Sequence, residues 1–326
     1  MKVLVIGGTV FLGRHVVAEA LSRGHEVTLF NRGSDTESFA GEVERVLGDR
    51  NTDIANLGDA RFDYCIDTSG YLPHQLVAAG THLASRVDRY AFVSSISVYA
   101  AFKAGMDESA ALSVLPDDAD PTVYDNAHYG PLKVLCEAAI EAAMPGRVLH
   151  VRSGLIVGPH DPTHRFTYWP VRVAKGGEFI APSGPDFPIQ MIHARDQARW
   201  IFDALEAGNM GAYNVTSPAG TYTMGDVIAA TVAVTGADAT PRYASSDFLT
   251  AEGVGPWMEL PLWLPEAALG MSRVSAERAR QNGLSLMPLE DIVRDTLAWF
   301  DSVPAQDWPA GLAADREAAL LAKLPG

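Results

Sequence analysis

Residues 3–13 read Val3-Leu4-Val5-Ile6-Gly7-Gly8-Thr9-Val10-Phe11-Leu12-Gly13, and this stretch decides the fold of the chain. The four apolar residues predict a short buried strand, and the glycines allow a tight turn. The pattern from 11 to 23 predicts an amphipathic helix. Because a helix begins with unpaired N–H groups, we expect those of residues 11–14 to point at one spot and to attract an anion.

Short apolar runs alternate with helical stretches along the next part of the chain. We expect strands at residues 2–6, 26–30, 43–47, 63–67, 89–94 and 147–152, and helices at 11–23, 74–85 and about 128–143. This alternation is typical of the α/β class, in which a doubly wound parallel sheet carries crossover helices on both faces.

Composition excludes several classes of protein. The chain has 326 residues, 48% of them hydrophobic, and a formal net charge of −15, so it repels nucleic acids and anionic membranes as a whole. The two cysteines, Cys65 and Cys136, lack CxxC spacing, which favours reduced thiols over a metal or disulfide framework. No run of eighteen apolar residues and no secretory leader pattern occurs. We therefore expect a cytoplasmic protein with no metal, nucleic-acid partner or membrane span.

The opening turn matches the fingerprint of a dinucleotide site in most respects. Gly7 and Gly8 make the turn, and Gly13 allows the helix to pack closely on the strand, but Val10 stands where the fingerprint asks for glycine. Its N–H survives the change, so a phosphate still binds if the valine side chain points aside and φ is negative. We expect the pyrophosphate to lie against Gly7, Thr9, Val10, Phe11, Leu12 and Gly13.

The ends of the second and third strands suggest how the adenosine half is bound. An Asp after the second strand would bind both ribose hydroxyls, whereas Asn31 followed by Arg32 suits a 2′-phosphate, so we favour NADP(H) over NAD(H). Arg32 is equally explained as a solvated turn residue. Asp49 can accept from the adenine amine or cap a helix that begins near Asn51.

A tyrosine and a lysine four residues apart share a face of the predicted helix at 128–143. An ammonium one turn from a phenol, with an oxidised nicotinamide nearby, favours the phenolate, so Tyr129 and Lys133 can shuttle a proton. A serine at the end of the strand predicted at 89–94 can donate to the substrate oxygen. Tyr99 and Lys103 have the same spacing, but Gly105 limits any helix there, so we favour Tyr129.

The alternation of short apolar runs and helical stretches ends after Gly158-Pro159, where prolines and aromatic residues become frequent. A helix at about 195–206 and a strand near 212–215 then return to the sheet. We predict a Rossmann domain from residues 1–160 and about 189–220, and a smaller C-terminal substrate-binding lobe from about 161–188 and 221–326. The two histidines of His160-Asp161-Pro162-Thr163-His164 lie between prolines, which favours a loop over a metal site.

Together these motifs resemble the extended short-chain dehydrogenase/reductase superfamily, also called the NAD-dependent epimerase/dehydratase family. The segments 152–159 and 192–196 are similar to later signatures of that family. The resemblance implies that Ser95, Tyr129 and Lys133 form the catalytic triad, and that Lys133 also holds the nicotinamide ribose. It further implies a loop near the cofactor at Thr68, Ser69 and Gly70, where Asp67-Thr68-Ser69-Gly70 replaces the usual Asn/His-Leu-Ala-Ala.

Three functions follow from this resemblance. The first is NADPH-dependent reduction of a carbonyl substrate, with Tyr129 as the acid, and the second is epimerisation of a nucleotide sugar by the same triad. The third is a non-catalytic cofactor sensor or RNA-binding protein, because the glycine turn is similar to that of chloroplast stem-loop RNA-binding relatives. We favour the first, with a small-molecule carbonyl, alcohol or nucleotide sugar as partner, and a homodimer is possible by the same resemblance.

Overall fold

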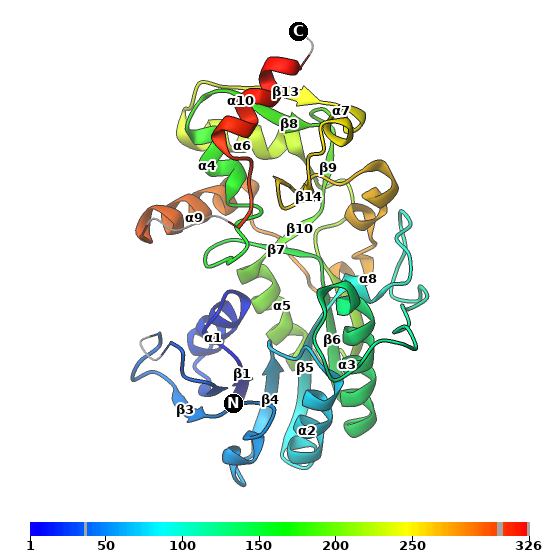
Figure 1. The fold of residues 1–326 in the computed structure, drawn as a ribbon. Helices are drawn as coiled ribbons and strands as arrows, with labels where there is room; N and C mark the ends of the chain where they lie inside the picture. The colour runs from blue at the N-terminus through cyan, green and yellow to red at the C-terminus, as the bar shows by residue number, and fades with distance from the viewer. Residues whose placement is uncertain (36–37, 305–308, 325–326) are drawn as a thin grey trace.

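The computed structural model describes residues 1–35, 38–304 and 309–324. Figure 1 shows a sheet with its helices in the lower part and a smaller lobe above it. Within these residues, seven parallel strands form one sheet in the order β11-β6-β5-β4-β1-β2-β3. They are β1 (Lys2–Ile6), β2 (Glu26–Asn31), β3 (Glu44–Leu47), β4 (Phe62–Asp67), β5 (Val87–Ser95), β6 (Val148–Ser153) and β11 (Gly211–Val215). The predicted doubly wound α/β class is confirmed.

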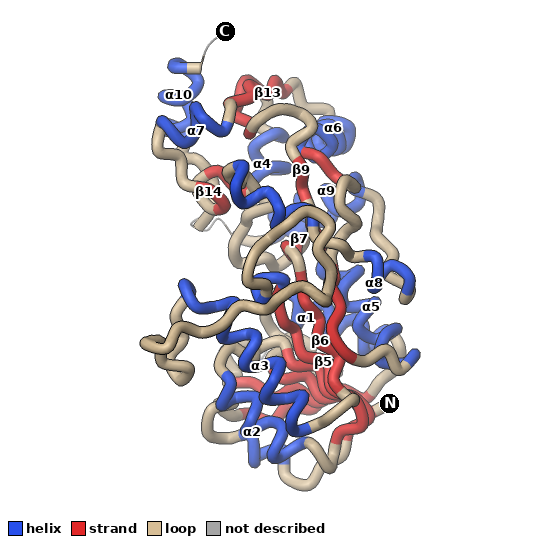
Figure 2. The backbone as a smooth tube through the Cα atoms, turned by 90° about the vertical axis from the view of Figure 1, so that its right-hand side faces the viewer, coloured by secondary structure: helices blue, strands red, loops and turns tan. Residues whose placement is uncertain are grey.

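Helices cover both faces of the sheet, which explains why its central strands are apolar throughout. In β1, Val3 and Val5 pack with α1 (Leu12–Ser22) and α5 (Ala194–Ala207). Leu4 and Ile6 point the other way, toward α2 (Pro73–Leu83) and α3 (Tyr129–Ala143). Figure 2 shows the strands between α2 and α3 on one side and α5 on the other.

The strand order reverses between β1 and β4, and this reversal positions the site. Ile6, the last residue of β1, pairs with Phe30 of β2 on one side and with Asp67 of β4 on the other. The chain then leaves β1 through α1 and β4 through α2, on opposite faces of the sheet. A crevice opens at the carboxyl ends of two such strands, which is where open α/β sheets bind ligands.

The lobe is built from short strands and helices around its own core, which includes Trp169, Phe179 and Trp263. Its strands are β7 (Leu155–Val157), β8 (Gly177–Pro182), β9 (Pro188–Ile189), β10 (Met191–His193), β12 (Tyr222–Thr223), β13 (Ala239–Ala244), β14 (Pro256–Trp257) and β15 (Leu260–Pro261). Its helices are α4 (Tyr168–Ala174), α6 (Met224–Thr235), α7 (Ser246–Ala251), α9 (Leu289–Ser302) and α10 (Ala314–Lys323), whereas α8 (Glu277–Gln281) packs beside β11, with its buried Ala279 in the core between the main sheet and α5. Our boundaries between sheet domain and lobe stay a prediction.

Most element ends lie within one or two residues of those expected from the sequence. The first helix begins at Leu12 rather than at residue 11, because Phe11 has φ 38° and ψ −116°, outside the helical region. Short 3₁₀ segments at Ile54–Leu57, Ile96–Val98 and Asn126–His128, and a longer one at Glu266–Arg273 with a kink at Ser272, complete the described elements. Within the described ranges, no helix has the length and apolar character needed to cross a membrane.

Candidate active site

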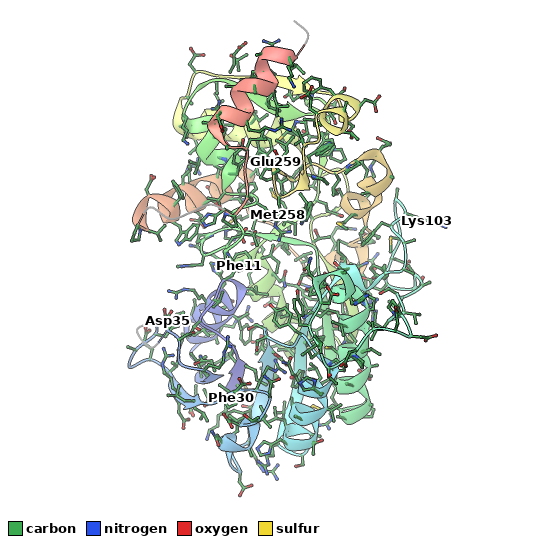
Figure 3. The ribbon with its side chains drawn as sticks, viewed as in Figure 1. Phe11, Phe30, Asp35, Lys103, Met258 and Glu259 are labelled. Atoms are coloured by element: carbon green, nitrogen blue, oxygen red, sulfur yellow. The ribbon has the colours of Figure 1, made fainter. Side chains whose placement is uncertain are left out.

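A cavity of about 970 Å³ lies at the carboxyl ends of the central strands and extends to the lobe. Figure 3 labels Phe11, after β1, and Met258, in the lobe, and both line the cavity. The structure brings nearly all of the predicted residues to its wall: Gly7, Thr9, Val10, Phe11, Leu12, Gly13, Asn31, Arg32, Asp49, Thr68, Ser69, Ser95, Tyr129 and Lys133. Gly70 lies behind the wall, where its carbonyl accepts a hydrogen bond from Lys133 Nζ (2.7 Å).

The glycine turn has a geometry that other residues could not adopt. Gly7 and Gly8 have φ of +106° and +91°. A Cβ on Gly7 would lie 2.5 Å from Thr68 Oγ1, and one on Gly13 would lie 2.8 Å from Gly8 Cα. The turn therefore keeps close backbone approach at the start of α1, which is what a pyrophosphate needs.

Val10 does not block this turn. Its side chain is 63% exposed and, unlike Phe11, it does not have a positive φ. The φ condition that we set for a phosphate to reach the residue 10 N–H is therefore met, and because the exposed side chain lies at the cavity wall, phosphate access to that N–H stays a prediction. The unusual backbone conformation falls on Phe11 instead, at φ 38°.

Our expectation of free N–H groups at all of residues 11–14 is wrong for two of them. Gly13 N–H donates to the Val10 carbonyl (3.0 Å), and Arg14 N–H donates to the Phe11 carbonyl (2.9 Å). These bonds form because the chain already turns at Val10 and Phe11, before the regular helix begins. The anion-binding end of α1 is therefore shifted toward the glycines.

The side chain of Asn31 is committed to the turn itself. Its Nδ2 donates to the Gly7 carbonyl (2.9 Å), and its Oδ1 accepts from Gly33 N–H (3.0 Å). One N–H of the amide is left for a ribose. Arg32 is exposed at the rim of the cavity, as both of our interpretations of it require.

Asp49 also lines the cavity, but its carboxylate has local partners. Oδ1 accepts from the backbone N–H (2.8 Å) and Nδ2 (2.6 Å) of Asn51. The bond from the Asn51 backbone is the main cause that lowers the pKa of Asp49. Asp49 thus closes a turn, and the next helical segment begins only at Ile54. Its second oxygen remains available to an adenine amine.

The three predicted catalytic residues meet at the start of α3. Tyr129 is the first residue of this helix, and its phenol lies close enough to Ser95, the last residue of β5, for Ser95 to oppose the rise that burial causes in the pKa of Tyr129. Ser95 Oγ also donates to Ser97 Oγ (3.1 Å). One turn further along α3, Lys133 Nζ lies 5.7 Å from the centre of the Tyr129 ring. A phenol, a hydroxyl and an ammonium thus face one part of the cavity.

Burial controls the protonation of both titrating groups. It raises the pKa of Tyr129 well above its ordinary value, contrary to our expectation that Lys133 would lower it. It lowers the pKa of Lys133 to about 8. Since Lys133 Nζ donates to the carbonyls of Gly70 (2.7 Å) and Val93 (2.9 Å), one N–H remains for another acceptor. Because its pKa is about 8, Lys133 is still mostly an ammonium at neutral pH.

Several cavity residues were not predicted from the sequence as site residues. Tyr71 and Tyr124 form an edge-to-face pair, with ring centres 5.6 Å apart, at the mouth near Tyr129. The guanidinium of Arg165 lies 5.0 Å from the centre of the Trp257 ring, and Arg50 lines the wall beside Ser69. These residues come from loops, and loop positions carry no periodic signal.

The histidine-rich segment 160–164 forms a loop, as expected, and its rings pack against other aromatic side chains. His160 and His164 both lie against Trp299 of α9, with ring centres 5.5 and 5.6 Å apart. Across the parts of the chain that the structure describes, no cluster of three or more His, Cys, Asp or Glu side chains could hold a metal ion.

The strand order, the glycine turn at its reversal point and the Ser95–Tyr129–Lys133 arrangement define a dinucleotide-dependent enzyme of the short-chain dehydrogenase type. Residues 3–216 match the model of the NAD dependent epimerase/dehydratase family, and the chain belongs to this family. The residues present fit the family's cofactor, because the cradle at Gly7 and Gly13 excludes a Cβ and the cavity continues past Asn31.

Solved structures with the same fold include several sugar-nucleotide epimerases. A UDP-Glc/GlcNAc 4-epimerase from Campylobacter jejuni has a TM-score of 0.69 at 16% identity, covering 93% of this chain and 99% of that one. UDP-glucose 4-epimerase from Bifidobacterium longum, in complex with NAD+ and UDP, has a TM-score of 0.62 at 19% identity, covering 93% of this chain and 99% of that one. UDP-glucuronic acid 4-epimerase from Bacillus cereus, in complex with NAD, has a TM-score of 0.64 at 16% identity, covering 93% of this chain and 99% of that one. No curated protein sequence matches the chain.

Proposed function

We propose that this enzyme epimerises a nucleotide sugar, using Tyr129 as acid and base at a secondary alcohol. This replaces the carbonyl reductase that we favoured from the sequence. The observation that carries the proposal is the Ser95–Tyr129 pair, which shares one cavity with the cofactor turn and with the cationic side chain of Arg165. The structural neighbours include several sugar-nucleotide 4-epimerases, which supports the same substrate class.

The triad divides the work as follows. Ser95 Oγ donates to the substrate oxygen and holds it beside Tyr129, whose phenolate removes the proton of the hydroxyl and later returns it. A nicotinamide held at the glycine turn would supply a reversible hydride acceptor for that carbon, so the cycle would consume no cofactor. Because burial raises the pKa of Tyr129, its phenolate would form only with the positive charges of Lys133 and of an oxidised nicotinamide beside it, and Lys133 would present its remaining N–H to the ribose.

Arg165 supplies the positive group that a substrate phosphate needs. Its Nε donates to Thr163 Oγ1 (3.0 Å), and its guanidinium lies over Trp257. Among the described residues, no acceptor is recorded for its two terminal nitrogens. Burial lowers the pKa of Arg165, as expected for a buried cation without a bound anion. Arg165 is also close enough to Tyr129 for their charges to interact. A bidentate contact with a phosphate or carboxylate fits this arrangement.

Purified protein incubated with UDP-sugars, and analysed by mass spectrometry and NMR, tests this function. We expect interconversion of two 4-epimers, with KM at least about tenfold higher in Arg165→Gln, because a charge-assisted contact is lost. Arg280→Gln, which removes an exposed ion pair with Glu277 on α8, is the matched control and should leave KM unchanged. Cofactor binding without turnover of any nucleotide sugar would contradict the proposal.

NADPH-dependent reduction is the second candidate, and Arg32 is the observation that favours it. An exposed cation after β2, with no carboxylate at that strand end, suits a 2′-phosphate, so we propose NADP(H) over NAD(H). The nucleotide can be released from denatured protein and identified by its mass, which distinguishes NADP(H)-dependent reduction from epimerisation with bound NAD. Tightly held NAD would favour epimerisation and contradict the NADP(H) preference, whereas exchangeable NADPH would favour reduction.

A further inference from the structure

A buried ion pair lies next to the catalytic lysine, and the mechanism above does not use it. Asp67, the last residue of β4, has no exposed surface, and Arg50 from the loop after β3 bonds both of its oxygens, at 2.7 and 2.9 Å. Tyr90 Oη (2.7 Å) and Ser69 N–H (3.0 Å) donate to the same carboxylate. Burial alone would raise the pKa of Asp67, but the charge of Arg50 and these hydrogen bonds hold it below its ordinary value.

The Asp67 carboxylate holds one loop, residues 67–70, which we call the Asp67 loop. Its Thr68 N–H and Oγ1 both donate to the Ile6 carbonyl (3.1 Å each), at the root of the glycine turn. Arg50 Nη1 donates to Ser69 Oγ (3.1 Å). The Gly70 carbonyl, at the other end of the loop, accepts from Lys133 Nζ (2.7 Å). The loop therefore joins the cofactor turn to the catalytic lysine.

Holding a loop in place with a buried ion pair carries a large desolvation penalty. Removing two charges from water costs free energy, and their mutual attraction often does no more than offset this cost. Apolar residues of similar size would therefore stabilise the fold equally well. The family usually has an uncharged loop here, as noted above. The pair is thus better explained by what it positions than by stability.

Resting on the proposed function, we propose that Arg50 is a positioning residue for Lys133. Arg50 fixes Asp67 and Ser69, these fix the Gly70 carbonyl, and this carbonyl holds the ammonium of Lys133 beside Tyr129 and the ribose. Without Arg50 the Asp67 carboxylate loses its charge partner, and the loop moves. Lys133 then loses an acceptor that favours its charged form.

The test uses Arg50→Lys, which keeps the charge but loses the two-point contact with Asp67. Binding of NADPH or NADH, followed by fluorescence, should weaken in the wild-type protein as Lys133 deprotonates above pH about 8. In Arg50→Lys we expect this midpoint to move down by at least about half a pH unit. The charged or titratable groups around Lys133 are Cys136, Asp67, Arg50 and Glu137, together with the phenols of Tyr71 and Tyr129, whose ring centres lie 5.0 and 5.7 Å from Nζ, and only Arg50 is changed.

Arg172→Lys is the matched control. It alters a similar buried pair, with Glu317 (2.7 Å), in the lobe, and should leave the midpoint where it is. An unchanged midpoint in folded Arg50→Lys would overturn the proposal. If Arg50→Lys does not fold, Ser69→Ala removes the hydrogen bond between Arg50 and Ser69 without changing any charge, and a shift of the midpoint in the same direction is expected.

The binding readout does not depend on turnover. If no nucleotide sugar is epimerised, the proposed function fails while the midpoint still decides the role of Arg50. If epimerisation occurs but the midpoint does not move, only the role of Arg50 fails. In the active case, kcat should fall in Arg50→Lys with KM for the sugar nucleotide changed less than about twofold, because Arg165 still holds the substrate.

Discussion

Two tyrosine–lysine pairs with identical spacing lie in quite different surroundings. Tyr129 and Lys133 lie on the first turn of α3 and both line the cavity. Tyr99 follows the 3₁₀ segment after β5, and its hydroxyl donates to Asn214 Oδ1 (2.6 Å) and accepts from Arg152 Nη1 (3.2 Å). Lys103 is exposed and is not part of the cavity wall.

The difference shows that partners, rather than spacing, assign the role. The Tyr99 hydroxyl donates its proton to Asn214 and accepts from Arg152, and Tyr99 does not line the cavity, so its proton is not available to a substrate there. The Tyr129 phenol lies close to Ser95, which also faces the cavity, and its lysine is buried nearby. The same two residue types are therefore a structural pair in one place and a chemical pair in the other.

The largest effect is expected from removing the two phenol hydroxyls in turn. Tyr129→Phe should lower kcat by about 10² to 10⁴, because no other group can exchange the proton with the substrate. Tyr99→Phe should change kcat less than about threefold, since its hydroxyl does not line the cavity. Steady-state kinetics of the two variants measure this. A fully active Tyr129→Phe combined with an inactive Tyr99→Phe would reverse the comparison.

The two lysines give the next largest difference. Lys133→Met should lower kcat by at least about tenfold and weaken cofactor binding, because the phenolate and the ribose both lose a positive partner. Lys103→Met should leave both constants unchanged, since this side chain is exposed and outside the cavity. Kinetics and fluorescence titration check both. Equal losses in the two variants would mean that the cavity does not contain the working lysine.

The pH dependence of the wild-type enzyme should show the titration of the buried lysine. Burial lowers the pKa of Lys133 to about 8, so the ammonium is present below that pH and is lost above it. We therefore expect kcat to fall above pH about 8, by about tenfold per unit once Lys133 is neutral. A constant rate from pH 7 to 10 would show that the charge of Lys133 is not needed.

The smallest effect is structural and falls on the other pair. Tyr99→Phe leaves Asn214 Oδ1, which is fully buried, without its donor, and we expect a loss of about 1–3 kcal/mol in the free energy of unfolding. Tyr124→Phe, at an exposed hydroxyl, is the control and should cost less than about 0.5 kcal/mol. Urea denaturation measures both. Equal costs would contradict the structural role of Tyr99.

Much of the fold and part of the candidate site could be predicted because the signals are local. The strands of the sheet are short apolar runs, and Pro131 is compatible with a helix only in its first turn, which places Tyr129 at the start of α3. Arg50 and Asp67 could not be paired in advance, because they are seventeen residues apart and follow different strands. Arg165 and Trp257 likewise meet only through the lobe.

By itself, the sequence determined the strand–turn–helix at residues 2–22 and the need for glycine at positions 7, 8 and 13, because backbone sterics act over a few residues. The tertiary structure alone decided that Asn31 holds the turn and that the Tyr99 hydroxyl is hydrogen-bonded to Asn214. Each of these depends on which strands and loops pack together, and no local pattern contains that information.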